Sequence, residues 1–376
     1  MAQHKIFTIN PGSTSTKIAL FQGDKILFSQ NVSHDAAFLA KFNSISEQYI
    51  YRKKMIEEIL EKNHISLEGV SAFVGRGGGL LPMEGGTYEI DELILEHASK
   101  CANGVQHPAC LGPLIAHEFA VKYGAKEYVV NPPDVDELQD LARMTGIKGV
   151  YRVVHLHALN LKETAIRHAK SIGRKYEDCN FVVCHIGGGI SISAHRKGKM
   201  IDGYDIVGGE GPMAPTRCGS ISVANLLKYC EDKDLKEVKK ICTQSGGFVS
   251  HLGVSDALEV FNRAQAGDKY AKMLWDTMIY QICKCIGSMA VTLHGKLDGI
   301  LLGGGMVYNE DMVRQIRELC QWIAPVTAYP GEFEMEAMAA GAIRILEGEE
   351  EVKKYKGVSN FQGFDFEHEK EVINEL

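Results

Sequence analysis

The fold of this chain can be read from two stretches, KIFTINPGSTSTKIALFQGDKILFSQNV at residues 5–32 and NFVVCHIGGGISISAHRKGKMIDGY at residues 180–204. In each, a run of β-forming residues meets a loop of small residues, a second run follows, the chain turns at a glycine, and a third run begins. Aligning Gly12 with Gly187 also aligns Gly23 with Gly198. The sequence therefore predicts two structurally similar halves.

Apolar residues at three- and four-residue spacing predict helices outside these stretches. The predicted helical segments span residues 56–63, 107–123, 157–172 and 270–293. Strand triplets combined with such helices indicate an α/β fold. We place the first domain at 1–147 and the second at 148–337, and we expect the segment from about 338 to 376 to pack back on the first domain. The charged residues from Glu347 onward are expected to be solvated.

Composition excludes several classes of function. The 376 residues are 45% hydrophobic and 24% charged, which is enough for two domains of ordinary size. The net charge is −7 and the basic residues form no stripe, so no nucleic-acid partner is expected. Without an apolar signal region or a membrane-spanning stretch, we expect a cytoplasmic protein and no membrane partner. The ten cysteines show no CxxC pair, which favours small buried side chains over disulfides or metal ligands.

Three loops of small residues follow β-forming runs: NPGSTSTK at 10–17, HIGGG at 185–189 and GGGM at 303–306. Glycine lets the backbone approach an anion, hydroxyls and amides can surround it, and Lys17 adds a positive charge. The first loop is neither a Walker A loop nor a Rossmann fingerprint, because a strand follows it instead of a helix. A polar hairpin turn is the alternative interpretation. Taken together, the three loops predict a cradle for a nucleoside triphosphate.

The order of these loops resembles the superfamily of sugar kinases, Hsp70 chaperones and actin. More specifically, the sequence resembles the acetate and butyrate kinase family along nearly its whole length. Seven collinear blocks carry the match: NPGSTSTK, VGRGGGL, HALN, CHIGGGISI, PTRCGSI, GILLGGGM and EFEMEAMA. The resemblance implies two ribonuclease-H-like domains in a duplicated actin-like ATPase fold with a central ATP cleft. It also implies ATP-dependent phosphorylation of a short-chain carboxylate by a homodimer or higher homo-oligomer.

The resemblance also assigns catalytic residues. A carboxylate acceptor is already anionic at neutral pH, so the chemistry needs cations around the transferring phosphoryl group and no general base. Arg76 and Arg217 match the family's arginines at the acceptor carboxylate and the phosphoryl group, and His157 matches the histidine that stabilises that group. Taken alone, a loop arginine is usually a surface ion-pair partner. For His155 we expect only a structural hydrogen bond.

ATP and Mg²⁺ are the cofactors that the resemblance implies. Glu334 matches the magnesium-associated glutamate, and Glu336 is the alternative if the register differs by two residues. The family usually places an aspartate where this chain has Asn131, so either Asp134 compensates or the metal is held more weakly. His185 bonds either phosphate or the backbone. The ATP-binding positions that match the family are Asn10, Ser13, Ser15, Lys17, His185, Gly187, Gly188, Gly189, Gly303, Gly304 and Gly305.

The acyl substrate is predicted from Gly77 and Gly78, which stand where acetate kinases carry bulky valines. Glycine would leave room for a longer acyl chain, and each added buried methylene is worth about 0.8 kcal/mol. GRGGG and HALN resemble the butyrate kinase branch, whereas TRCGSI reads more like acetate kinase. The sequence therefore predicts butyrate, with acetate, propionate or a branched acid as alternatives. Two rival functions are a polyol or sugar kinase using Asp134 or Asp136 as a base, and an actin- or Hsp70-like ATPase binding module.

Overall fold

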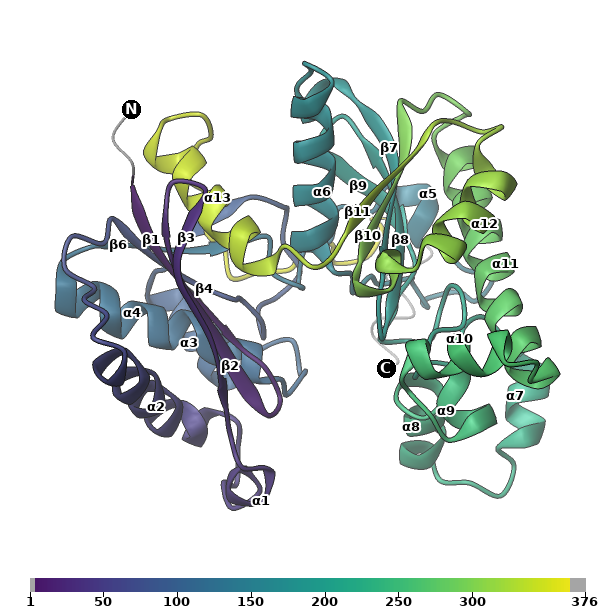
Figure 1. Cartoon of the computed structure of the whole chain (residues 1–376), viewed down its shortest axis with the longest axis horizontal. Coiled ribbons are helices and arrows are strands. Elements are labelled where there is room, and N and C mark those ends of the chain that lie inside the picture. Colours follow the sequence, from purple (N-terminus) through teal and green to yellow (C-terminus); the bar gives the residue numbers. More distant parts are fainter. Residues whose placement is uncertain (1–3, 366–376) are drawn as a thin grey trace. The chain divides into compact units, whose positions relative to one another are not determined.

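The computed structural model describes residues 4–365, which form two compact units (Figure 1). The first unit holds residues 4–136 and 333–362, and the second holds 137–332 and 363–365. The chain enters the second unit earlier than the predicted boundary at 147, and it returns to the first unit at 333 instead of 338. Residues 366–376 of the predicted C-terminal segment lie outside the described residues.

The first unit is built on a six-stranded sheet with the order β3-β2-β1-β4-β6-β5. β1, β2 and β3 form an antiparallel meander, β4 pairs parallel to β1, and β6 pairs parallel to β4. The strand bounds are β1 (Lys5–Pro11), β2 (Ser15–Gln22), β3 (Lys25–Ser33), β4 (Ala72–Gly75), β5 (Thr87–Glu89) and β6 (Lys126–Val130).

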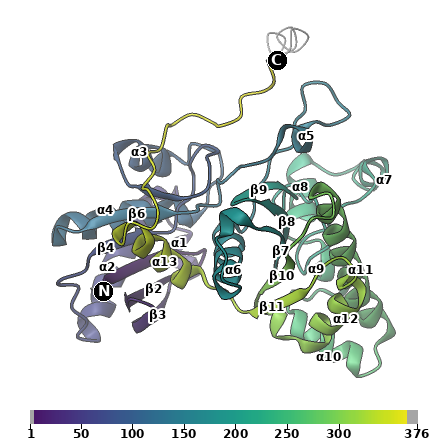
Figure 2. The same cartoon turned by 90° about the horizontal axis from the view of Figure 1, so that it is seen from above.

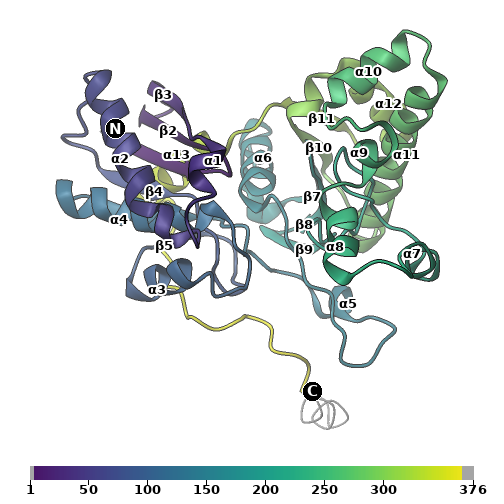
Figure 3. The ribbon, with the colours of Figure 1, turned by 90° about the horizontal axis from the view of Figure 1, so that it is seen from below.

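Helices cover both faces of this sheet. α2 (Tyr49–Lys62) and α4 (Leu111–Tyr123) lie side by side on one face (Figure 3), and α13 (Glu334–Leu346) covers the other. Phe7, Phe73 and Phe119 fill the core between the sheet and α4, with ring centroids 5.9–6.0 Å apart. Shorter elements complete the unit: α1 (Ala36–Leu39), η1 (Ser46–Gln48), α3 (Glu92–Lys100) and η2 (Pro108–Cys110).

The segment after α13 packs against the first unit. The backbone N–H of Lys353 donates to the carbonyl of Thr87, at 2.8 Å. Tyr355 is 5% exposed, and its hydroxyl accepts a hydrogen bond from the backbone N–H of Leu81. The expectation of a solvated extension from Glu347 is therefore wrong for this part of the segment, because the tyrosine buries its ring among apolar residues despite its charged neighbours.

The second unit repeats the strand order of the first. Its sheet runs β9-β8-β7-β10-β11, which matches β3-β2-β1-β4-β6, and β7, β8 and β9 again form an antiparallel meander. Both meanders carry a bulge between their second and third strands. The predicted pair of similar halves is confirmed. The strand bounds are β7 (Asn180–Ile186), β8 (Ile190–Arg196), β9 (Lys199–Gly203), β10 (Gly299–Gly304) and β11 (Val326–Pro330).

α6 (Ala158–Ser171) packs on one face of this sheet, and α11 (Lys269–Thr292) and α12 (Glu310–Cys320) lie on the other (Figure 2). The four predicted helical segments correspond to α2, η2 with α4, α6 and α11. The remaining elements are α5 (Asp140–Arg143), η3 (Tyr176–Asp178), α7 (Val223–Tyr229), α8 (Leu235–Thr243), α9 (Gly247–Leu252), α10 (Ala257–Gln265) and η4 (Gly305–Tyr308). Within residues 4–365, no helix is both long and apolar enough to cross a bilayer. The ten cysteines are all free thiols.

Candidate active site

The first predicted phosphate loop is a tight turn between β1 and β2. Its closing hydrogen bond runs from the N–H of Gly12 to the carbonyl of Ser15, at 2.7 Å. Asn10 and Lys17 are paired across the two strands, so their side chains lie on the same face of the sheet. Lys17 is exposed, as is Ser13 at the tip of the turn. The predicted residues of this loop are therefore gathered in one hairpin.

Glu334 joins this hairpin to Arg76. Its carboxylate accepts a hydrogen bond from Nδ2 of Asn10 at 2.7 Å and lies 3.9 Å from Nε of Arg76. Arg76 is 7% exposed; burial lowers its pKa, and the charges of Glu334 and Asp134 oppose that shift. A guanidinium remains charged despite such a shift. Of the two predicted carboxylates, Glu334 is the one whose contacts with Asn10 and Arg76 are recorded in the described part of the chain.

Asn131 has a local structural role. Its φ is +39°, a region that asparagine tolerates better than most residues. Its Oδ1 accepts a hydrogen bond from the N–H of Gly86 at 2.7 Å, and its carbonyl lies 3.4 Å from Nη1 of Arg76. Asp134 is 5% exposed, and its charge acts on Arg76. A negative charge is thus present near Arg76 although residue 131 is neutral.

The glycines around Arg76 are explained by close packing. A Cβ atom on Gly77 would lie 2.5 Å from Cγ1 of Val129, and one on Gly78 would lie 3.2 Å from Cβ of Ala109. The free volume that we expected beside Gly77 and Gly78 is therefore absent on the side where a side chain would project. These glycines let the loop approach β6 and η2, so their role in an acyl pocket does not follow from missing bulk.

His157 and His185 meet in the second unit. His157 directly precedes α6, and its Nδ1 lies 2.8 Å from Oγ of the buried Ser191. Its ring stacks on that of His185, with centroids 4.0 Å apart and 23° between the planes. Nε2 of His185 lies 3.9 Å from a carboxylate oxygen of Glu332. The predicted histidines thus form one stacked pair, in which Ser191 contacts the His157 ring.

His155 faces another group. Its Nδ1 lies 3.2 Å from Oδ1 of Asp205, which agrees with the structural role expected for it.

Arg217 lies against the second glycine loop. Its Nη1 occupies the space that a Cβ atom on Gly189 would fill. Its Nε and Nη1 atoms are buried and have no hydrogen-bond partner among residues 4–365. Burial lowers the pKa of Arg217, and Asp205 opposes that shift. Because unsatisfied buried donors are costly, a guanidinium in this state is suited to receive an anion.

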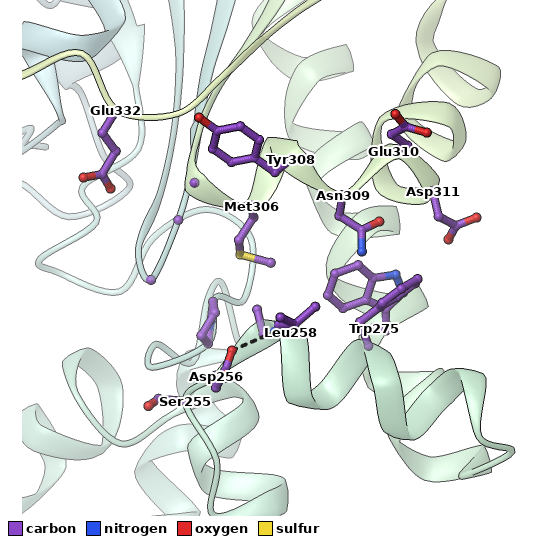
Figure 4. Close-up of a pocket in the computed structure, with 16 residues that line it drawn as sticks. Ser255, Asp256, Leu258, Trp275, Met306, Tyr308, Asn309, Glu310, Asp311 and Glu332 are labelled. Carbon is purple, nitrogen blue, oxygen red and sulfur yellow. Dashed lines mark hydrogen bonds between the residues drawn. The ribbon is translucent and has the colours of Figure 1, made fainter.

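The third glycine loop approaches the second closely. Gly304 has a φ of +99°, and a Cβ atom there would collide with the backbone of Ile186. Next to it is a cavity of about 680 Å³, a size typical of ligand pockets. Figure 4 shows Met306, Leu258 and Trp275 along its apolar wall. Its polar lining residues include Asp256, Asn309 and Glu332.

The residues present fit Mg²⁺ bound together with a phosphate ligand. Among residues 4–365, no three His, Cys, Asp or Glu side chains are grouped to hold a metal by themselves. Protein sites for Mg²⁺ commonly use one or two carboxylates with water and substrate phosphate. The carboxylate of Glu334 beside the side-chain amide of Asn10 offers oxygen ligands of this kind.

Several residues of this site were missed by sequence reasoning. Ser191 and Glu332 lie inside the matched blocks CHIGGGISI and EFEMEAMA, but neither was singled out there. Of the pocket residues, Trp275 lies in α11, whose pattern is that of an ordinary helix, and Asp256 is the N-cap of α10. The only sequence signal for Ser191 was its position within the block CHIGGGISI.

Comparison with known proteins identifies the family. A model described as the acetokinase family matches residues 148–323. The chain is 44% identical over 358 residues to butyrate kinase 2 of Clostridium acetobutylicum. This match covers 94% of this chain and 99% of that protein. The chain belongs to the acetokinase family. It is also 40% identical to the probable butyrate kinase of Clostridium botulinum, over 94% of this chain and 99% of that protein.

The fold of this acetokinase-family chain matches a solved structure as well. The acetate kinase of Porphyromonas gingivalis superposes with a TM-score of 0.72 at 19% identity, covering 91% of this chain and 100% of that one. The predicted family and the predicted two-domain fold are both confirmed.

Proposed function

We propose that this acetokinase-family enzyme transfers the γ-phosphoryl group of ATP to the carboxylate of butyrate, forming butyryl phosphate and ADP. The names of the two curated relatives support butyrate as the acid. The observation that carries the transfer chemistry is Arg217, whose buried donors lack a partner within residues 4–365 and lie against the glycine loop.

ATP binding is assigned to the glycine loops and the cavity beside them. The apolar wall with Met306 and Trp275 suits a nucleobase, and the polar residues near Asn309 suit its edge or the ribose. The backbone at Gly187–Gly189 and Gly303–Gly305 suits the phosphates. In the first unit, the hairpin with Ser13, Ser15 and Lys17 is assigned to phosphate as well.

Arg76 is assigned to the acceptor carboxylate. A carboxylate oxygen of butyrate forms a new bond to the γ-phosphorus while the bond from phosphorus to the ADP oxygen breaks, and no proton has to be removed. Arg76, Arg217 and His157 reduce the repulsion between two anions and stabilise the charge on the transferring group. Mg²⁺ held by Glu334 would neutralise phosphate charge. We also propose a cytoplasmic location and a homo-oligomer, both carried over from the family resemblance.

Trapping with hydroxylamine tests this function, because acyl phosphates give coloured hydroxamates. The purified enzyme is incubated with MgATP and acetate, propionate, butyrate, isobutyrate, glycerol or no acceptor. We expect the highest kcat/KM with butyrate, and loss of the signal in Arg217→Ala. Higher kcat/KM with acetate would reject butyrate as the preferred acid. Glycerol-dependent ADP formation would favour a polyol kinase, and ATP hydrolysis without any hydroxamate would favour the ATPase binding module.

A further inference from the structure

Arg52 is a buried arginine that lies behind the β1–β2 hairpin. It belongs to α2, and its exposed fraction is 0%. Nη1 donates to the carbonyl oxygens of Gly12 and Ser15, at 2.8 and 3.2 Å, and Nη2 donates to that of Ser13, at 3.1 Å. Gln48, one turn earlier on the chain, accepts from Nε and Nη2 and holds the guanidinium in this orientation.

These contacts decide which backbone groups of the hairpin remain available. Arg52 takes the carbonyls of Gly12, Ser13 and Ser15, and the N–H of His34 donates to the carbonyl of Thr14 at 2.8 Å. Four successive carbonyls are thus bound from within the unit. In contrast, the N–H groups of Ser13 and Thr14 have no partner within the described part of the chain, and both residues are exposed. Adjacent N–H groups without competing carbonyls form an anion-binding nest.

The charge of Arg52 points to the same conclusion. Within residues 4–365 it forms no ion pair with a carboxylate, so its acceptors are neutral oxygens only. Burial lowers its pKa to about 10, which leaves it positive at neutral pH. An uncompensated buried cation is costly. An anion bound on the outer side of the hairpin would offset this cost by electrostatic attraction, because only the short loop separates it from the guanidinium of Arg52.

We propose that Arg52 is a positioning residue for nucleotide phosphate: it holds the hairpin carbonyls inward, leaves the N–H groups of Ser13 and Thr14 for the anion, and adds a buried positive charge behind them. This proposal rests on the proposed nucleotide-binding function of the hairpin. Arg52 does not touch the substrate in this role, so its loss should weaken nucleotide binding selectively.

The test compares Arg52→Met, Arg52→Lys and the control Arg344→Met, all in the full-length chain. Arg344 is a partly buried arginine of the same unit, in the last turn of α13, and it pairs with Glu350. Calorimetry gives the Kd of MgADP, steady-state kinetics gives KM for ATP and for butyrate, and circular dichroism reports folding. For Arg52→Met we expect the Kd of MgADP and the KM of ATP to rise about tenfold or more, with the KM of butyrate within about twofold of wild type.

Arg52→Lys keeps the charge but loses the fork that reaches three carbonyls, so we expect an intermediate Kd. If Arg52→Met does not fold, Arg52→Lys decides alone. A further variant, Arg52→Ala, leaves space for a free guanidinium. Added ethylguanidinium should partly restore MgADP binding to Arg52→Ala and should have no effect on Arg344→Met. A folded Arg52→Lys with the wild-type Kd, or an equal rise in Kd for Arg344→Met, would overturn the proposal. A wild-type enzyme that binds MgADP but makes no acyl phosphate would reject the proposed function and leave the role of Arg52 to be decided by the Kd values.

Discussion

The guanidinium of Arg217 occupies the space that a Cβ atom on residue 189 would fill, so Arg217 can take its position only because residue 189 is glycine. The sequence places these two residues in separate motifs, a glycine loop and a PTRCGS block. The structure joins them: the loop that exposes backbone to phosphate also makes room for the arginine. The third glycine of GGG, Gly189, is thus required to make room for Arg217 and not only to form a turn.

Replacing Gly189 by alanine should therefore act through Arg217. The new methyl group displaces the guanidinium, and we expect kcat to fall by about 10²–10³, the usual effect of losing one donor to transition-state charge. Steady-state kinetics with butyrate measures this. Gly146→Ala is the control, because Gly146 is an exposed loop glycine with open space around its Cβ position, and its kcat should stay at the wild-type level.

Arg217→Ala should lose a similar factor of about 10²–10³ while remaining folded. The double variant of Gly189→Ala and Arg217→Ala should be no slower than Arg217→Ala, because both changes remove the same interaction. Additive losses in the double variant would mean that alanine at residue 189 acts on something other than Arg217.

Ser191 should control the orientation of His157. In Ser191→Ala the hydrogen bond at Nδ1 is lost, and we expect kcat to fall about tenfold, equivalent to one hydrogen bond of about 1.4 kcal/mol. Ser193→Ala is a matched control: Ser193 lies on the same strand, is equally buried, and lies 2.8 Å from Nε2 of His195. It should lower Tm without changing kcat. Equal losses of kcat in both variants would place the effect in the packing of β8.

A larger side chain at residue 77 should lower the activity toward acetate and toward butyrate to the same extent. Valine there meets Val129 and overpacks the loop, at a cost of about 1–3 kcal/mol in stability. We expect a lower Tm and a parallel loss of kcat/KM for acetate and for butyrate. Gly78→Ala, with a nearest Cβ contact of 3.2 Å, should be milder. A Gly77→Val enzyme that retains acetate kinase activity and loses butyrate kinase activity would instead support the original idea that missing bulk sets chain length.

His34 should make folding sensitive to acid. Its Nε2 lies 2.8 Å from Oγ1 of Thr16, and burial lowers its pKa to about 4, with the charge of Arg52 adding to that shift. The unfolded chain binds this proton near pH 6.5 but the folded chain only near pH 4, so stability falls as pH is lowered through this window. His34→Gln should show a flatter dependence of Tm on pH between 7 and 4 than the wild type. If the slope of Tm against pH is the same in His34→Gln as in the wild type, His34 is not the source of the acid sensitivity.

The repeated fold could be predicted because its signal is local. The glycine spacing around Gly12 and Gly187 reflects two hairpins of the same geometry, and the apolar periodicity of α11 reflects burial of one helix face. The predicted catalytic residues were placed by resemblance, and the structure brings Arg76 to Glu334 and Arg217 to Gly189 within their respective units.

What the sequence did not reveal depends on packing between distant segments. Arg52 stands in YIYRKK, where it reads as an ordinary helical arginine, and only the fold places it behind residues 12–15. Gly77 looked like open space because a sequence records the absent side chain but not Val129 opposite it. The burial of Tyr355 is hidden by the charged residues around it for the same reason.

The most direct test of the central claim is a ³¹P NMR time course of the enzyme with MgATP and butyrate. Transfer to the carboxylate predicts that an acyl phosphate resonance grows in step with ADP, one for one, and that it grows about 10²–10³ times more slowly in the Arg217→Ala enzyme. ADP growing in step with inorganic phosphate, with no acyl phosphate and with the same rate when butyrate is omitted, would contradict the claim and leave an ATPase.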